Sequence, residues 1–290
     1  MSDSDTYLIV APHPDDECIG AAVWLRRHRE SVRILHVTDG SPRDMDDARA
    51  AGFSSREAYA DTRRSELYSA LAVAGITPDR CYSFDFVDKE TYLHLPEFLE
   101  KMTVLIEELR PALVLSPAYE GGHPDHDSTA LAVAMARDRL NRSFQHREYR
   151  LYHAGPDGSM RTNDFLPDDR VPAEVDFLSP EEREIKSRML SCFETQAHVV
   201  RLFTLENELF RDAPRYNFTF PPHDGPLLYE RWGWPITGEE WRRLARELYG
   251  RPISGAECHG DKKKLAMRYR ETTAAGQFMS RETAESLDEE

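Results

Sequence analysis

Short apolar runs alternate with longer amphipathic stretches through the first half of the chain, and this alternation predicts its secondary structure. The β-favouring apolar runs predict strands at 7–11, 32–37, 80–87, 113–117 and 147–154. Stretches with helical periodicity predict helices at 19–30, 55–76, 95–112 and 128–140. Because strand and helix follow each other in turn, the pattern predicts an α/β fold. Its sheet should be doubly wound, Rossmann-like and mainly parallel, with helices on both faces.

The composition changes near residue 200, where the regular alternation ends. Proline, phenylalanine and tryptophan gather in 216–235, which indicates a loop-rich C-terminal attachment. The end of the chain is polar and acidic, a composition typical of a frayed or disordered segment. We therefore expect a main domain over 1–200, an attachment over 201–257 packed on that domain, and a polar, partly disordered tail over 258–290.

Charge and cysteine usage narrow the classes of partner. The chain has 52 acidic residues against 37 Lys and Arg, a net charge of −15, which opposes binding to nucleic acid or to an anionic membrane. No apolar run approaches the ~18 residues that a membrane span needs, so we expect no membrane insertion. The four cysteines are far apart and form no C-x-x-C pair, which argues against a disulfide framework. The N-terminus has no basic signal region, so we expect a cytoplasmic protein with a small-molecule partner.

Two dense polar clusters follow predicted strands. The sequence PHPDDE (12–17) comes directly after the strand at 7–11, and HPDH (123–126) follows the strand at 113–117. In open α/β sheets, ligands bind at the carboxyl edge of the parallel strands. We therefore expect both clusters to meet at that edge.

The combined clusters offer imidazoles and carboxylates without a thiolate. These are the ligand types of a catalytic zinc site or of another borderline metal, in which the protein leaves one position for water. His13, Asp16 and His126 are the three candidate ligands.

Other polar features of the sequence are weaker candidates. The motif TDGSP (38–42) fits a turn as well as a site, and isolated histidines such as His36 are expected on the surface or in the core. Both the dinucleotide glycine fingerprint and the P-loop motif are absent, which argues against nucleotide binding.

Helix capping is the ordinary alternative for these acidic residues. A cap explains one of Asp15 and Asp16 but explains the whole His-Pro-Asp-Asp-Glu run poorly. Glu17 fits a cap of the following helix. Asp127 fits a cap of a helix that begins near residue 128 better than it fits a ligand.

The pair of motifs resembles the PIG-L/LmbE family of metal-dependent de-N-acetylases. The likeness continues in RRSEL (63–67), FDFVD (84–88) and KSRMLSCFETQ (186–196), and it covers about residues 5–200. The chain departs from the family at Pro12, where many members have Ala, and at Thr195, where Ser is common. Neither departure falls on a candidate ligand.

The resemblance implies a single zinc per chain, with iron(II) as the alternative, held by His13, Asp16 and His126. It also implies that Asp15 is the general base. A zinc ion lowers the pKa of its bound water to ~7, so a nearby carboxylate can accept a proton while the water attacks an acetamide carbonyl.

The resemblance implies supporting roles for four further residues. A protonated His123 would stand near the developing oxyanion, and Asp125 would orient His123 or a ligand imidazole. Arg63 and Asp88 match positions that contact substrate hydroxyls in sugar-processing relatives. A surface arginine and a loop aspartate explain these two residues equally well.

The implied function is a hydrolase that removes an acetyl group from an N-acetylated amino sugar or glycoconjugate. An amidase that cleaves another sugar-linked amide, of the thiol-conjugate type, would use the same site. A non-catalytic sugar-binding protein is the alternative from another class, and the presence of all three ligands and the base argues against it. The aromatics of YERWGW (229–234) suit a sugar-stacking wall and an oligomer contact equally, although core packing is their commonest role, so a homo-oligomer stays open.

Overall fold

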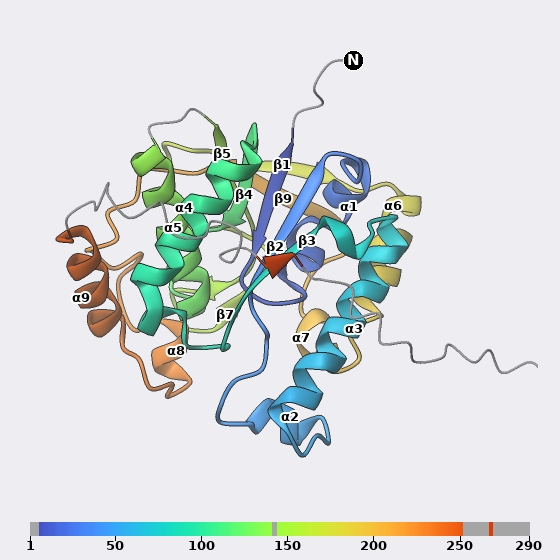
Figure 1. The fold of residues 1–290 in the computed structure, drawn as a ribbon, viewed down its shortest axis with the longest axis horizontal. Helices are drawn as coiled ribbons and strands as arrows, with labels where there is room; N and C mark the ends of the chain where they lie inside the picture. The colour runs from blue at the N-terminus through green and yellow to red at the C-terminus, as the bar shows by residue number, and fades with distance from the viewer. Residues whose placement is uncertain (1–5, 141–143, 252–266, 269–290) are drawn as a thin grey trace, which may run out of the picture.

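One eight-stranded sheet forms the centre of the molecule. The computed structural model describes residues 6–140, 144–251 and 267–268, so most of the predicted tail (258–290) lies outside the described residues. The strands follow the order β10-β3-β2-β1-β4-β5-β9-β8 (Figure 1). They are β1 (Tyr7–Ala11), β2 (Val32–Thr38), β3 (Cys81–Phe86), β4 (Leu113–Pro117), β5 (Gln145–Tyr149), β8 (Glu174–Phe177), β9 (Asn207–Asp212) and β10 (Met267–Arg268). A separate pair joins β6 (His153–Ala154) to β7 (Met160–Arg161).

The five strands from β3 to β5 are parallel, and each strand outside them pairs antiparallel with its neighbour. At the centre, Ile9 of β1 lies between Ile34 of β2 and Leu115 of β4. The chain leaves β1 toward one edge of the sheet, through β2 and β3, and then returns to place β4 on the other side of β1. The carboxyl ends of β1 and β4 therefore border the switch point of the sheet, where ligands bind in folds of this kind.

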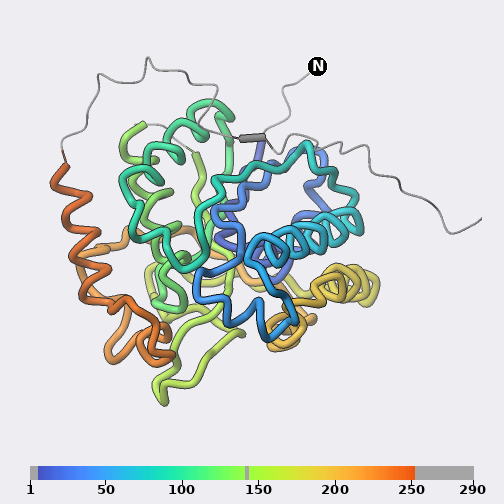
Figure 2. Tube along the Cα trace, turned by 60° about the horizontal axis from the view of Figure 1, so that its bottom comes forward, coloured from blue at the N-terminus to red at the C-terminus, as the bar shows by residue number. Residues whose placement is uncertain are grey.

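Helices cover both faces of the sheet, as expected. One face carries α1 (Asp16–Arg27), α3 (Arg56–Ala74) and α6 (Pro180–Leu190), and the other carries α4 (Leu95–Leu109), α5 (Pro124–Leu140) and α9 (Gly238–Tyr249) (Figures 1 and 2). The short helices are α2 (Asp46–Ala50), α7 (Ala197–Val200), α8 (Leu228–Arg231), and the 3-10 turns η1 (Pro78–Arg80) and η2 (Thr91–His94). Within the described ranges, no helix has both the length and the apolar character that a bilayer crossing requires. The α/β prediction is confirmed.

A break in α1 separates its first turns from the rest of the helix. Ala21 has non-helical angles (φ −148°, ψ 29°), so the backbone N–H groups that follow it lack their usual helical partners. The carboxylate of Glu208 on β9 accepts hydrogen bonds from Val23 N (2.9 Å) and Trp24 N (3.0 Å). Lys186 Nζ lies 3.2 Å from the same carboxylate, and both side chains are fully buried. This ion pair from α6 and β9 supports the break and so helps to set the direction of the first turn, which carries Asp16.

The structure differs from two sequence expectations. The expected strand at 147–154 is divided, because β5 pairs with β4 and β9 whereas β6 pairs with β7. Between them, the buried Arg150 donates to Asn207 Oδ1 and to the carbonyl of Asn163. The expected boundary at residue 200 does not divide the sheet, since β9 pairs directly with β5. A change in composition marked residue 200, but strand pairing across it makes β9 part of the central sheet.

Candidate metal centre

The loop after β1 is tied to β2 and turns its acidic side chains inward. The carbonyl of Pro12 accepts hydrogen bonds from the backbone N–H (3.0 Å) and the hydroxyl (2.9 Å) of Thr38. Asp15 occupies the N-cap position of α1, yet its side chain makes no capping hydrogen bond. The carboxylate of Asp16 instead accepts the backbone N–H of His13 at 2.9 Å. The capping explanation is therefore wrong for this pair, and both carboxylates are available to the site.

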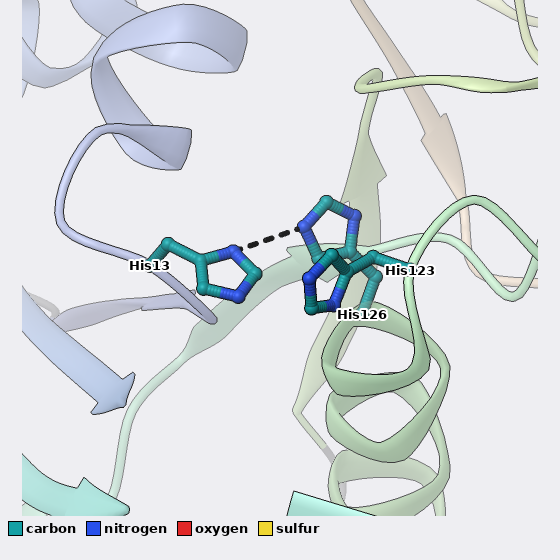
Figure 3. A group of neighbouring side chains, drawn as sticks. All are labelled: His13, His123 and His126. Carbon is teal, nitrogen blue, oxygen red and sulfur yellow. Dashed lines mark hydrogen bonds between the residues drawn. The ribbon is translucent and has the colours of Figure 1, made fainter. Parts of the chain in front are cut away.

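The imidazole of His13 lies between two groups of side chains. Its Nδ1 is 3.0 Å from Oδ2 of Asp16 and 3.3 Å from Nε2 of His126, the contact drawn in Figure 3. Its Nε2 is 3.1 Å from Oδ1 of Asp88 and 3.3 Å from Oδ2 of Asp125. Burial alone would lower the pKa of His13, but the carboxylates of Asp88 and Asp16 raise it well above the usual value.

The atoms on the Nδ1 side form a compact triangle. His13 Nδ1, Asp16 Oδ2 and His126 Nε2 are separated by 3.0, 3.3 and 3.3 Å. A tetrahedral ion with bonds of ~2.0–2.1 Å keeps its ligand atoms about 3.3 Å apart. Burial alone would raise the pKa of Asp16, but His126 and His13 lower it well below its usual range, so the carboxylate is ionised. The triangle therefore fits three ligands of one metal ion.

A second set of potential ligands lies on the Nε2 side of His13. One ligand atom each from His13, Asp88, His123 and Asp125 lies within 4.8 Å of the others. The carboxylate of Asp125, however, is already engaged by Lys89 N (2.7 Å), Thr91 N (3.1 Å) and Thr91 Oγ1 (2.6 Å). These bonds fix Asp125 as an acceptor for the His13 ring, and they make this set the poorer metal site.

Asp88 lies at the centre of the cluster rather than on an exposed loop. Its Oδ1 is buried, lies 3.7 Å from Nε2 of His123, and accepts no well-aligned hydrogen bond. Burial alone would raise the pKa of Asp88, but the ring of His13 lowers it far below its usual range. Asp88 lies in a turn after β3, as a loop aspartate would, but it is buried against His13; its contact with substrate stays a prediction.

Arg63 on α3 is buried as well, so the surface explanation for it is wrong. Its guanidinium donates to Oδ2 of Asp15 at 2.9 Å and to the carbonyl of Gly40. Gly40 has φ +66°, and a Cβ at this position would lie 2.6 Å from the Arg63 guanidinium. The turn at 38–42 therefore supports the site, because the missing side chain of Gly40 leaves room for the Arg63 guanidinium. Burial raises the pKa of Asp15 to about 6, although the charge of Arg63 acts in the opposite direction.

His123 faces the cluster as a neutral ring. The backbone N–H of Asp125 donates to Nδ1 of His123 at 3.1 Å, which assigns the ring proton to Nε2. Burial, together with the charge of His13, lowers the pKa of His123 well below its usual value. The hydrogen bond from Asp125 N and the lowered pKa favour a ring that donates through Nε2, and the role of His123 near the oxyanion stays a prediction.

Asp127 shapes the loop that carries His123. The helix α5 begins at Pro124, earlier than expected, so Asp127 lies within its first turn rather than at its cap. Its Oδ1 accepts hydrogen bonds from Gly121 N (3.0 Å) and Glu120 N (3.3 Å). The role of Asp127 is therefore structural, but it bonds the preceding loop instead of capping a helix.

Several residues of the site carried no strong signal in the sequence. Lys89 and Thr91 donate hydrogen bonds to Asp125. Their position after the third predicted strand was the only feature of the sequence that could have placed them at the site. Tyr152 packs against His126, with ring centroids 5.1 Å apart. Glu17 caps no helix: it is buried, with Oε1 3.1 Å from Nε2 of His36. This contact with His36 could not be recognised from the apolar pattern of β2.

Comparison with known proteins adds an independent finding. The family model described as PIG-L: GlcNAc-PI de-N-acetylase matches residues 8–137. A Bacillus anthracis protein named probable N-acetyl-alpha-D-glucosaminyl L-malate deacetylase 2 is 36% identical over 146 residues, which cover 47% of this chain and 61% of that protein. The diacetylchitobiose deacetylase of Thermococcus kodakarensis is 31% identical over 133 residues, covering 43% of this chain and 46% of that protein. The solved zinc-inhibited form of a teicoplanin deacetylase has a TM-score of 0.55 at 18% identity and covers 73% of this chain and 99% of that one.

The family model covers the part of the chain that holds both motifs. The solved structure shares the α/β fold, and the aligned region spans less than two thirds of either curated relative. The clusters at 12–17 and 123–126 lie inside the matched range, whereas the aromatic segment 216–235 lies outside it. The expected resemblance is confirmed, since residues 8–137 match the PIG-L family model.

Proposed function

We propose that this protein is a metal-dependent hydrolase that removes the acetyl group from an N-acetylated amino sugar or a glycoconjugate that carries one. The observation that carries the proposal is the buried triangle of His13, Asp16 and His126, with Asp15 and His123 beside it. The names of the Bacillus and Thermococcus relatives supply the bond and the substrate class, since both are deacetylases of N-acetylated sugar compounds.

His13, Asp16 and His126 would hold one zinc ion, with iron(II) as the alternative. Such an ion supplies Lewis acidity and makes water a better nucleophile near neutral pH. The carboxylates of Asp88 and Asp125 lie beside Nε2 of His13, an arrangement that fixes the orientation of a metal-binding imidazole. Two imidazoles and a carboxylate are ligands that zinc accepts, and this donor set is what supports zinc here.

The remaining residues would divide the acid and base work between them. Asp15 accepts a proton from the water that attacks the acetamide carbonyl and returns it to the departing amine. Arg63 holds Oδ2 of Asp15 in place by its 2.9 Å hydrogen bond. His123 donates its Nε2 proton as a hydrogen bond to the oxygen that develops negative charge. Cleavage of the C–N bond then yields acetate and a free amine.

The test joins metal analysis to amine release from a panel of N-acetylated amino sugars. We expect about one zinc or iron per chain, and amine release that chelation removes and metal restores. Asp15→Ala should abolish release while metal still binds, whereas His126→Ala should weaken metal binding itself. Normal activity with equal metal content in both variants would contradict these roles. Release from other sugar-linked amides alone would favour the amidase, and a chain that binds no metal under any loading condition would favour the non-catalytic sugar-binding protein.

A further inference from the structure

The start of α8 is hydrogen-bonded to the loop that carries His123, and the segment after α8 is hydrogen-bonded to α8. The backbone N–H of Leu228 donates to the carbonyl of Gly121 at 3.0 Å. Gly121 has φ +70°, and a Cβ there would lie 2.6 Å from the side chain of Leu227, so the two segments are in close contact. Trp234 N donates in turn to the carbonyl of Tyr229 at 3.0 Å. The two tryptophans of this segment are therefore held at the metal centre.

Five aromatic rings form a closed circuit that includes two imidazoles of the site. Centroid distances are 4.7 Å from His123 to Trp234, 5.1 Å from Trp234 to Trp232, and 6.2 Å from Trp232 to Tyr152. The circuit closes through Tyr152 and His126 at 5.1 Å and through His126 and His123 at 5.2 Å. The aromatic wall defined by Tyr152, Trp232 and Trp234 is therefore continuous with the candidate metal centre.

The two tryptophans of this wall differ in their freedom to meet a ligand. Trp234 is half-buried, and Lys89 Nζ lies 4.8 Å from its ring centroid, so one region of its π surface is already in contact with a cation. Trp232 is 43% exposed. Gly233 between them has φ +70°, and a Cβ there would meet no atom within 4 Å, so space stays open beside the turn. Trp232 is thus the accessible end of the wall.

We propose that Trp232 stacks against a second pyranose ring, linked to the N-acetylated sugar whose acetamide enters the site. This inference rests on the proposed function. Trp232 lies two ring contacts from His123, with centroid spacings of 4.7 and 5.1 Å that are typical of rings packed against each other. A sugar with its acetamide at His123 therefore borders Trp234, and the next ring of the substrate reaches Trp232. The C–H face of a pyranose is apolar and complements an indole face.

The wall distinguishes this ligand from a second copy of the chain. A stable protein interface buries about 800 Å² on each partner, whereas one indole accommodates one ring. The rings of Tyr152 and Trp234 also contact His126 and His123, so Trp232 is joined to the site by ring contacts on both sides. The position of Trp232 therefore favours a substrate of at least two rings.

Binding in an inactive background tests the proposal independently of turnover. Titration calorimetry would compare N-acetylglucosamine with N,N′-diacetylchitobiose, using zinc-loaded Asp15→Asn protein with and without Trp232→Ala. We expect Trp232→Ala to weaken disaccharide binding by about three- to tenfold, the range of one aromatic contact, and to leave monosaccharide binding unchanged. Trp232→Phe should retain most of the affinity, and Phe177→Ala, at an exposed aromatic of β8, should have no effect.

Each outcome either supports or overturns the stacking proposal. Equal losses for both sugars, no loss for the disaccharide, or no binding of either sugar to the Asp15→Asn protein would overturn it. Selective loss for the disaccharide would support it even if the wild-type protein released no amine. That last result would contradict the hydrolase while leaving the binding role of Trp232 intact.

Discussion

Asp125→Asn tests which side of the His13 ring faces the metal. In the wild-type protein, Oδ2 of Asp125 accepts from Lys89 N at 2.7 Å and lies 3.3 Å from His13 Nε2, while Oδ1 accepts two hydrogen bonds from Thr91. An asparagine of the same shape keeps one oxygen, which suits the Thr91 side. Its NH2 group then faces Lys89 N and His13 Nε2. Both are hydrogen-bond donors, so neither has an acceptor.

The size of the effect follows from these contacts. Two donors lose their acceptor, and each loss costs about 1–3 kcal/mol, so the free energy of unfolding of the metal-free protein should fall by about 2–6 kcal/mol. The His13 ring also loses the acceptor that orients it. If Nδ1 is the metal ligand, zinc affinity should fall about 10- to 100-fold, the usual cost of removing such a partner.

Zinc titration against a competing chelator, with urea denaturation of the metal-free protein, measures both quantities. Thr91→Val is the matched control, because it removes one hydrogen bond to Oδ1 and leaves the His13 side intact. Asp16→Asn should remove stoichiometric zinc binding, since it changes a proposed ligand. If Asp125→Asn abolishes zinc binding while Asp16→Asn preserves it, the metal lies on the Nε2 side and our assignment is refuted. Unchanged zinc affinity in Asp125→Asn would refute the orienting role.

Three further predictions concern the support of the site and the stability of the fold. Gly40→Ala should lower the free energy of unfolding by about 1–3 kcal/mol, measured by urea denaturation, because a side chain at φ +66° is strained and its Cβ overlaps Arg63; wild-type stability would contradict this. Glu208→Ala should cost about 3–5 kcal/mol in the same assay, since it leaves Lys186 buried without its partner, whereas Glu206→Ala at an exposed ion pair should cost less than about 1 kcal/mol. Burial lowers the pKa of His146 to about 3, so between pH 6.5 and about 3 the unfolded chain binds more protons and stability falls as the pH falls. From pH 7 to 5 this residue should contribute a loss of about 2 kcal/mol that His146→Gln removes, and equal pH profiles would refute it.

Much of the fold could be predicted from the sequence because its signals are local. The apolar runs at 7–11 and 113–117 became β1 and β4 with the same bounds, since a strand covered on both faces must be apolar along its length. The later strands β8 and β9 were missed. Their residues mix charged and apolar positions, and Glu208 on β9 is buried only because Lys186 and the broken helix α1 satisfy its carboxylate.

The candidate site also has some features that are local in the sequence and others that depend on remote segments. The two motifs identified His13, Asp16 and His126 as candidate ligands, because residue type and position after a strand are visible in the sequence. Other features depend on distance between remote segments. That Arg63 is buried against Asp15, 48 positions away, cannot be recognised from either residue alone. The same holds for the circuit of rings that joins Trp232 to the imidazoles.

Residue pattern alone was thus sufficient for the order of elements in the first half of the chain, for the edge of the sheet where both motifs lie, and for the kinds of atom that they offer to a metal. The folded arrangement was needed to show that His13 presents Nδ1 to Asp16 and His126 while Nε2 faces Asp88 and Asp125. It was also needed to show that Nδ1 of His123 accepts the Asp125 N–H and that Trp232 belongs to an aromatic wall beside the imidazoles. Hydrogen-bond direction, burial and ring contact depend on groups brought together from distant parts of the chain, whereas periodicity and residue type are properties of each segment.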